Sequence, residues 1–384
     1  MRWGTRIAPV VAWVVPRLYR NRQKSEAATP TAPPPLPVEH WTAISDGLHN
    51  LTTDLAWWRG SYYLVHSSSP WHMASTDSRI IVWSSPDARA WTKIAELRMP
   101  GADIRDPKLA VIGDRLFLYV LRNDQLVAEP SATAFTFTDD GVRWAPLSPC
   151  GPDGWLFWRP KQRGDRWFVP AYWKDHGRSI LLSSTDGASW EEVSRIHDGD
   201  RNDETDLEFL PDGTAVVTAR LEISDSMFGD DGACTLIATA PPPYTTWTAE
   251  RCATNRLDGP CLFAYGDTVF AVGRRHRRVR GGRFNRRAGF LGRKRTALYA
   301  VDPARRELVH LVDLPSAGDT GYPGVVLHGD SLTICYYTND PTTDPSWFVG
   351  MFLPSEVHIA RLSMAKLAQL AHARVGAATI EVTA

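Results

Sequence analysis

The chain has 384 residues, of which 43 are lysine or arginine and 43 are aspartate or glutamate, so its formal net charge is zero. This length suffices for one large domain or two ordinary ones, and the balanced charge argues against a surface built to attract nucleic acid or an anionic membrane. The 16 tryptophans indicate repeated aromatic packing, and some of them are candidate platforms for sugar rings.

Residues 1–38 are expected to lie outside the folded domain. The apolar run 7–15 is too short to span a bilayer, and the basic residues that follow it lead to no small-residue cleavage site of a secretory signal. Residues 25–38, SEAATPTAPPPLPV, have the composition of a proline-rich linker. The sequence therefore predicts no stable membrane span and leaves open whether the protein is cytoplasmic or exported.

A short turn motif recurs along the chain. Three copies combine Ser or Thr, Asp and Trp at the same offsets, and a fourth, degenerate copy retains the tryptophan: SSPDARAW ending at Trp91, TDDGVRW at Trp144, SSTDGASW at Trp190 and PPPYTTW at Trp247. Self-similarity with a period of about 50 residues indicates a repeat architecture. The Asp is expected to accept backbone N–H bonds, the Gly to permit the turn, and the Trp to pack between neighbouring repeats.

The units of the repeat contain β-hairpin signals, two apolar runs around a Gly-Asp or Asp-Gly turn. Six such hairpins occur, and they begin near Asp54, Asp106, Arg159, Glu204, Asp258 and Tyr322. Four strands per unit and six units predict an all-β protein, a six-bladed β-propeller of four-stranded antiparallel blades. We expect the propeller to occupy residues 39–364 and residues 365–384 to form a tail with at most one short helix.

The blade geometry predicts which side chains gather at the propeller axis. The innermost strand of a blade starts on one face and its neighbour returns to that face. The strand starts carry Asp54, Arg105, Asp106, Arg159, Glu204, Asp206, Asp258 and Tyr322, and the strand ends carry His66, Arg122, Trp173, Arg220, Arg274 and Tyr337. Carboxylates and arginines that converge on one cavity shift one another's pKa values and are candidate catalytic groups.

The segment 204–220, ETDLEFLPDGTAVVTAR, resembles the part of sialidases in which a Glu opens a strand, Asp-Gly turns it and an Arg closes the hairpin. The recurrent turns resemble the Asp-box of the same superfamily, and the resemblance covers residues 42–362. It implies that Glu204 polarises the nucleophile and that Tyr322, in DTGYPGVV, is that nucleophile. It further implies that Arg220 and Arg274 (or its neighbour Arg275) bind the substrate carboxylate. The implied activity is retaining hydrolysis of terminal sugars of glycans.

A tyrosine nucleophile suits a substrate whose anomeric carbon bears a carboxylate, because a carboxylate nucleophile would be repelled. Arginines hold such a carboxylate through bidentate bonds, and Asp77 is our candidate for the loop aspartate that acts as general acid. Sialidases begin their first blade with an Arg-x-Pro motif, whereas this chain has NLTTDLAWW. Arg105 and Arg159 are the candidates to replace that arginine, and Trp173 and Tyr337 are further candidates for substrate contact.

Two alternatives remain open. The segments TDLAWWRGSYYLVH, RDPKL and ETDLEFL also resemble furanosidase-type propellers, which implies Asp54 as nucleophile, Asp106 as transition-state stabiliser and Glu204 as acid. The second alternative is a non-catalytic propeller that binds glycans.

The remaining features concern partners and cofactors. Residues 274–295 hold a cluster of Arg and Lys that we expect to form a solvated loop or to contact an acidic glycan, and its few aromatic residues give little support for nucleic-acid binding. No metal-ligand spacing and no phosphate-binding loop occur, so we expect neither a metal nor a nucleotide cofactor. The expected partner is a carbohydrate, and the protein is expected to be a monomer.

Overall fold

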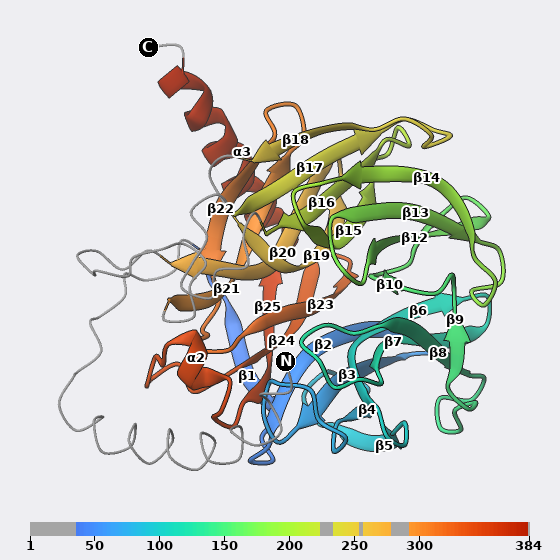
Figure 1. The fold of residues 1–384 in the computed structure, drawn as a ribbon. Coiled ribbons are helices and arrows are strands. Elements are labelled where there is room, and N and C mark those ends of the chain that lie inside the picture. The colour runs from blue at the N-terminus through green and yellow to red at the C-terminus, as the bar shows by residue number, and fades with distance from the viewer. Residues whose placement is uncertain (1–35, 223–232, 253–255, 278–291, 383–384) are drawn as a thin grey trace.

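The computed structural model describes residues 36–222, 233–252, 256–277 and 292–382, with side chains up to residue 375. Its strands form six antiparallel sheets arranged around one axis, which confirms the predicted six-bladed β-propeller of four-stranded blades (Figure 1). Most of the basic cluster at 274–295 lies outside the described residues.

The blades follow one another along the chain, and each runs from the axis outwards. Blade 1 contains β2 (His49–Trp58), β3 (Ser61–Ser69), β4 (Arg79–Ser85) and β5 (Thr92–Leu97), and blade 2 contains β6 (Asp103–Ile112), β7 (Arg115–Asn123), β8 (Ala132–Thr138) and β9 (Ser148–Cys150). Blade 3 contains β12 (Arg166–Trp173), β13 (Arg178–Ser184) and β14 (Glu191–Asp198), and its innermost strand is split into β10 (Trp155–Phe157) and β11 (Lys161–Arg163).

The last three blades have the same order. Blade 4 contains β15 (Asn202–Phe209), β16 (Ala215–Leu221), β17 (Cys234–Ala240) and β18 (Thr248–Cys252). Blade 5 contains β19 (Leu257–Tyr265), β20 (Thr268–Arg277), β21 (Arg293–Asp302) and β22 (Glu307–Asp313). Blade 6 contains β23 (Gly321–His328), β24 (Ser331–Thr338), β25 (Glu356–Ser363) and, outermost, β1 (Glu39–Ile44).

Strand β1 closes the ring. It comes first in the chain and pairs antiparallel with β25, with Trp41 opposite Ile359. The first and last described strands therefore share blade 6, which ties the two ends of the propeller together and leaves no gap between its first and last blades.

The core lies between neighbouring blades, and the sequence of β7 shows why. Its residues alternate between two clusters, because successive side chains of a strand point to opposite faces of the sheet. Leu116, Leu118 and Val120 pack towards blade 1, whereas Phe117 and Tyr119 pack towards blade 3. Both faces of a blade are buried, so its middle strands are apolar throughout rather than alternately apolar and polar.

The recurrent turns have the expected local structure. Asp87, Asp140 and Asp186 each accept N–H bonds from the backbone two and three residues ahead, at 2.7–3.2 Å. These bonds hold the pKa of all three carboxyls below the ordinary range. Trp144 and Trp190 pack into the clusters between blades 1 and 2 and between blades 2 and 3. The turns join the third and fourth strands of a blade, at the end opposite to the start of its innermost strand.

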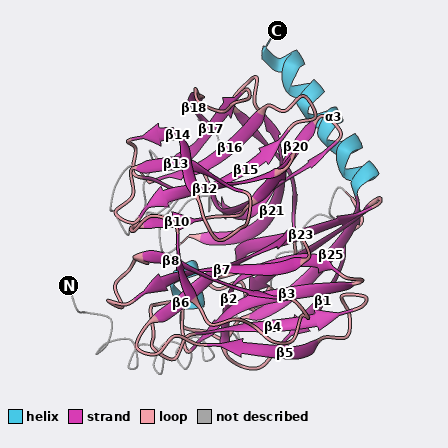
Figure 2. Cartoon of the chain, turned by 90° about the vertical axis from the view of Figure 1, so that its right-hand side faces the viewer, coloured by secondary structure: helices cyan, strands magenta, loops and turns pink. Residues whose placement is uncertain are grey.

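Two helices accompany the described strands. Helix α2 (Trp347–Gly350) is one turn in the connection from β24 to β25, and α3 (Met364–Val382) follows β25 directly. Figure 2 shows α3 along the outside of the propeller, where Leu367 and Ala371 are buried against blades 5 and 6. Within the described residues, no helix combines the length and the apolar character needed to cross a membrane.

Candidate active site

The start of the innermost strand is irregular in five blades. A register shift interrupts the pairing of β2, β6, β15, β19 and β23 with the next strand. In four of these bulges one residue has a positive φ: Thr52 at 45°, Asp106 at 53°, Gly259 at 57° and Tyr322 at 45°. Bulges re-aim side chains and are frequent beside active sites, and left-handed backbone in a non-glycine residue is strained. The bulges thus mark one end of the axis as the candidate site.

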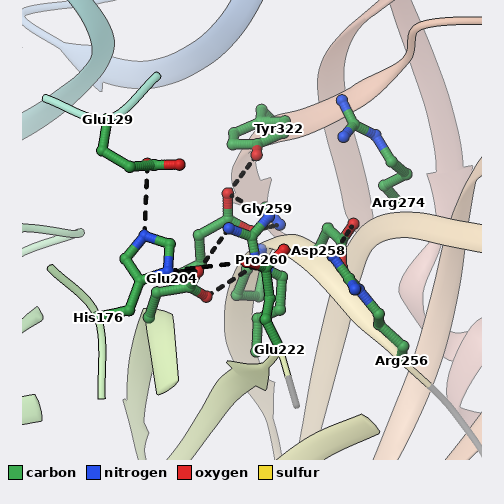
Figure 3. A network of polar contacts seen from close by, with 12 residues as sticks. Glu129, His176, Glu204, Glu222, Arg256, Asp258, Gly259, Pro260, Arg274 and Tyr322 are labelled. Carbon is green, nitrogen blue, oxygen red and sulfur yellow. Dashed lines mark hydrogen bonds and ion pairs between the residues drawn. The ribbon is translucent and has the colours of Figure 1, made fainter. Parts of the chain in front are cut away.

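Tyr322 and Glu204 form the centre of this site. The Tyr322 hydroxyl donates a hydrogen bond to Glu204 Oε1, although 118 positions separate the two residues (Figure 3). Glu204 Oε2 accepts the N–H of Gly259 at 2.7 Å, and Arg220 lies 3.0 Å from Oε1. A Cβ at position 259 would come within 2.7 Å of the Tyr322 ring, so only glycine lets the ring lie against this peptide.

Burial shifts the proton affinity of both groups. Glu204 is only 5% exposed, and desolvation raises the pKa of its carboxyl to about 7, against the opposing effect of Arg220. Desolvation and the neighbouring Glu204 also hold the pKa of Tyr322 well above its ordinary value. Near neutral pH the pair therefore combines a protonated phenol with a carboxyl that titrates in the physiological range.

The two arginines of the resemblance contact protein carboxylates. Arg220 forms a bidentate pair with Asp203, at 2.8 Å and 2.6 Å. Arg274 is buried and donates to Asp319 Oδ1 at 3.0 Å and to the hydroxyl of Tyr337 at 2.6 Å. The Arg274 guanidinium also lies 5.0 Å from the centre of the Tyr322 ring. Arg220, Arg274 and Tyr337 are thus all beside the Tyr322–Glu204 pair, where the sequence placed them.

Asp54 and Arg159 belong to a separate network on the axis. Arg159 bridges Asp54 at 3.1 Å and Asp206 at 3.0 Å, and it donates to the carbonyls of Pro260 and Pro323. The second oxygen of Asp54 accepts the N–H of Leu109 at 2.7 Å. The innermost strands of all six blades meet in these contacts. Farther along the strands lies a cavity of about 190 Å³ lined by Asp54, Arg159, Lys161 and Trp167, among others.

Blade 2 contributes a strained aspartate and a buried lysine. Asp106 Oδ1 is buried without a hydrogen-bond partner, and burial raises the pKa of this carboxyl. Arg105 pairs with Asp103 at 2.5 Å. Lys108, which the sequence analysis did not single out, is 1% exposed with its ammonium 4.5 Å from the Trp158 ring, and burial and Arg159 lower its pKa.

Two further expected site residues make no contact with the central pair. Asp77 is exposed in the connection from β3 to β4, and within the described part of the chain its carboxylate has no hydrogen bond or ion pair. Trp173 stacks with Arg178 at 4.3 Å and donates to Asp175 at 3.0 Å. The structure thus places Trp173 in an ion-and-ring cluster at the end of β12.

Histidines are the main component that the sequence analysis missed. His176 lies 3.4 Å from Glu129 (Figure 3) and 3.4 Å from Asp203. These carboxylates raise the pKa of His176 to about 9 despite its burial. His49 and His72 both contact Asp319. Each set joins residues from separated segments, so no spacing in the sequence could have revealed it. Three metal-ligating atoms come together in His49, His72 and Asp319, and also in His176, Asp203 and Glu222. In the second group Arg220 already occupies both oxygens of Asp203.

Comparisons with known proteins concern the fold. No family model and no curated protein matches the chain. Among solved structures, the endosialidase of phage phi92 matches with a TM-score of 0.63 and 10% identity, over 90% of this chain and 72% of that one. A mutant of Trypanosoma rangeli sialidase displaying trans-sialidase activity matches with a TM-score of 0.59 and 12% identity, over 88% of this chain and 61% of that one. The NanB sialidase of Streptococcus pneumoniae matches with a TM-score of 0.60 and 11% identity, over 88% of this chain and 72% of that one. The chain has a sialidase-like six-bladed propeller fold.

This sialidase-like propeller departs from the sialidase pattern in its first blade. The bulge residue of β2 is Thr52, whose hydroxyl contacts Ser67 at 2.8 Å and accepts the N–H of Asp106 at 3.2 Å. The first blade therefore contributes a hydroxyl where the resemblance called for a guanidinium. Arg105 and Arg159, the two expected substitutes, hold Asp103, Asp54 and Asp206 instead of facing the central pair unpaired.

Proposed function

We propose that the protein is a retaining glycoside hydrolase that acts on terminal sugars, with Tyr322 as nucleophile and Glu204 as its base. The hydrogen bond from the Tyr322 hydroxyl to Glu204 carries the proposal. A phenol is a weak nucleophile at neutral pH and needs an adjacent base, and a carboxyl with a pKa of about 7 suits proton transfer at that pH.

The reaction has two balanced steps. In the first, the Tyr322 oxygen bonds to the anomeric carbon, its proton passes to Glu204, and the glycosidic C–O bond breaks as an acid protonates the leaving oxygen. In the second, water attacks the anomeric carbon and gives a proton to the deprotonated acid, while the tyrosine oxygen leaves and takes its proton back from Glu204. Two successive inversions retain the configuration. Arg220, 3.0 Å from Glu204 Oε1, stabilises the ionised carboxylate between turnovers.

The general acid is assigned to Asp77 by the resemblance, and Asp106 is its competitor. Asp77 lies on an exposed connection, as an acid that reaches over a bound sugar would. Asp106 is half-buried, and desolvation raises its pKa, so its carboxyl keeps a proton more readily. Loss of the general acid slows the cleavage of glycosides with poor leaving groups more than of those with good ones. The activity of the variant that lacks the acid, Asp77→Asn or Asp106→Asn, should therefore be restored by an activated aryl glycoside, and this distinguishes the two assignments.

A second candidate is the same reaction on a sugar without a carboxylate. Arg220 and Arg274 already hold Asp203 and Asp319, and the innermost strand of the first blade, β2, carries no arginine. A buried guanidinium that is paired with a protein carboxylate gains less from a substrate carboxylate, because one ion pair replaces another. This observation favours an uncharged glycone.

The experiment is an assay of the purified full chain against a panel of aryl glycosides that includes a sialoside and an arabinofuranoside. Sialoside cleavage that is lost in Tyr322→Phe and kept in Asp54→Asn supports the first candidate. Cleavage of an uncharged glycoside with the same dependence on Tyr322 supports the second. Activity that is lost in Asp54→Asn, with folding intact, would instead support the furanosidase alternative. Glycan binding without turnover would indicate a binding propeller.

A further inference from the structure

Three side chains from separate segments converge beside the candidate active site. His49 Nε2 lies 3.1 Å and His72 Nδ1 lies 2.6 Å from the same oxygen, Oδ2 of Asp319. His49 opens β2, His72 belongs to the connection from β3 to β4, and Asp319 lies two residues before β23. We propose that these three side chains bind a divalent transition-metal ion, with Zn²⁺ as the best fit. This site is independent of the proposed hydrolase function.

The hydrogen bonding of His49 favours a metal ligand over a simple ion pair. Its Nδ1 lies 2.7 Å from the carbonyl oxygen of Leu353, which can only accept, so Nδ1 carries the proton. In the neutral ring Nε2 then presents its lone pair to a carboxylate oxygen, and two acceptors face each other unless a second ring proton or a metal ion lies between them. Metal-bound histidines typically donate their other ring N–H to a backbone carbonyl or a carboxylate.

Asp319 is oriented in the way that a ligating carboxylate requires. Its Oδ1 accepts from Arg274 at 3.0 Å, from the Tyr337 hydroxyl at 2.8 Å and from Trp347 Nε1 at 2.9 Å. These three donors fix the carboxylate plane, and the other oxygen, Oδ2, faces the two imidazoles. The Arg274 charge lies across the carboxylate from Oδ2, so the carboxylate screens it from an ion at the ligand atoms.

The spacing and burial of the ligands agree with this assignment. Two ligands of a tetrahedral zinc with bonds of 2.0–2.2 Å are about 3.3–3.6 Å apart, so the His49–Asp319 pair needs to move little and His72 must withdraw by several tenths of an ångström. His49 and Asp319 are fixed and buried, whereas the side chain of His72 is 22% exposed. His72 can therefore adjust, and it provides the route by which an ion enters.

The ligand set determines the class of metal. Two imidazoles and one carboxylate suit zinc and its first-row neighbours, whereas calcium and magnesium prefer sites made of oxygen alone. Three protein ligands leave a fourth tetrahedral position for water or another ligand, which is the pattern of an open rather than a closed zinc site.

The test is metal binding by the full chain produced without a histidine tag. Zinc content is measured by elemental analysis after dialysis, and Co²⁺ titration is followed by its visible absorption, which reports tetrahedral coordination by nitrogen and oxygen. We expect the wild type to bind one equivalent of metal and His72→Ala to bind it at least tenfold more weakly. The His72 side chain is partly exposed, so the variant should fold, and circular dichroism verifies that it does. His176→Asn, in the other histidine–carboxylate cluster, is the matched control and should bind as the wild type does.

Two outcomes would overturn the proposal. The first is a wild-type chain that takes up neither Zn²⁺ nor Co²⁺, which would make the three groups an imidazolium–carboxylate cluster. The second is equal metal affinity in the wild type and in folded His72→Ala. A further readout is the melting temperature, which a chelator should lower in the wild type and leave unchanged in His72→Ala, because bound metal stabilises only the folded state that has the site.

Discussion

Two buried ionic clusters lie close to the propeller axis, and they differ in what their protons can do. In the axial network, Asp54 and Asp206 share Arg159, and each also accepts a backbone N–H from a neighbouring blade. In the central pair of the candidate site, Tyr322 and Glu204, which we call the rim pair here, the Tyr322 hydroxyl donates to Glu204, whose pKa is raised to about 7. Both clusters are buried and charged, so burial and charge alone do not identify the candidate catalytic groups.

The two clusters differ in the partners of their carboxylates, because the partner either can or cannot exchange a proton with the carboxylate. An arginine remains protonated at any pH that a protein survives, so Arg159 cannot exchange a proton with Asp54 or Asp206, and we expect the axial network to hold the blades together. A tyrosine and a glutamate can exchange the proton that they share. The comparison therefore predicts that changes in the axial network affect stability, whereas changes in the rim pair affect turnover.

The largest expected effect is that of Tyr322→Phe. Removal of the nucleophile should lower kcat on the preferred glycoside by about 10³-fold or more, with little change in melting temperature, because only the hydroxyl is lost. Tyr336→Phe is the matched control, since Tyr336 is a buried tyrosine of the same blade whose hydroxyl donates to the Pro315 carbonyl at 3.0 Å. Equal activities of the two variants would contradict the assigned role of Tyr322.

Arg159→Met should produce the next effect, and it should appear in stability. The substitution leaves Asp54 and Asp206 buried without their shared cation, and such a loss costs about 3–5 kcal/mol. The free energy of unfolding in urea measures it. Arg115→Met is the control, because that arginine is 50% exposed in its pair with Asp139 and should contribute at most about 1 kcal/mol. A stable Arg159→Met with lost activity would place the axial network in the catalytic machinery.

The pH dependence of activity tests the raised pKa of Glu204. Glu204 accepts the Tyr322 proton only when ionised, so kcat/KM should fall about tenfold per pH unit as the pH drops below about 7. The profile is measured with the substrate that the panel identifies. In Glu204→Gln the residual kcat/KM should not fall in this way as the pH drops below about 7. If the same fall in kcat/KM persisted in Glu204→Gln, the titrating group would be one other than Glu204.

The sequence predicted the fold because the propeller repeats itself. Each hairpin carries its own turn signal, and blades bury both faces, so local patterns and global architecture agree six times over. Strand β1 was less visible, since it completes blade 6 with residues from the other end of the propeller. Contacts of this kind leave no short-range signal.

The candidate site was predicted in its composition and less well in its pairings. Glu204, Arg220, Arg274, Tyr322 and Tyr337 gather as expected, because each occupies a strand start or a strand end next to the axis. Their partners could not be foreseen. Asp319 precedes β23 rather than belonging to it, and the bulges move neighbouring side chains by one register position. A sequence indicates which side chains lie at strand ends near the propeller axis, but not the direction in which a bulge turns each of them.

The smallest effect distinguishes the two clusters by the sign of a stability slope. The folded state holds the proton of Glu204 up to about pH 7, compared with 4.5 for an ordinary glutamate, so its contribution to stability is complete below about pH 4.5 and is lost as the pH rises through about 7. Glu204→Gln does not titrate. Its free energy of unfolding relative to wild type should therefore rise by about 2–3 kcal/mol between pH 4.5 and 7.5, whatever its offset at low pH.

Urea unfolding of both proteins at a series of pH values measures this slope. Tyr336→Phe, which changes no group that titrates in the window, should differ from wild type by a constant amount. A constant difference for Glu204→Gln as well would mean that Glu204 is ionised throughout, held by Arg220 in the way that Arg159 holds Asp54. The rim pair would then be a second structural cluster, and the distinction between an exchangeable and a fixed proton would have to be sought at Asp106, a half-buried carboxyl of the site whose pKa desolvation also raises.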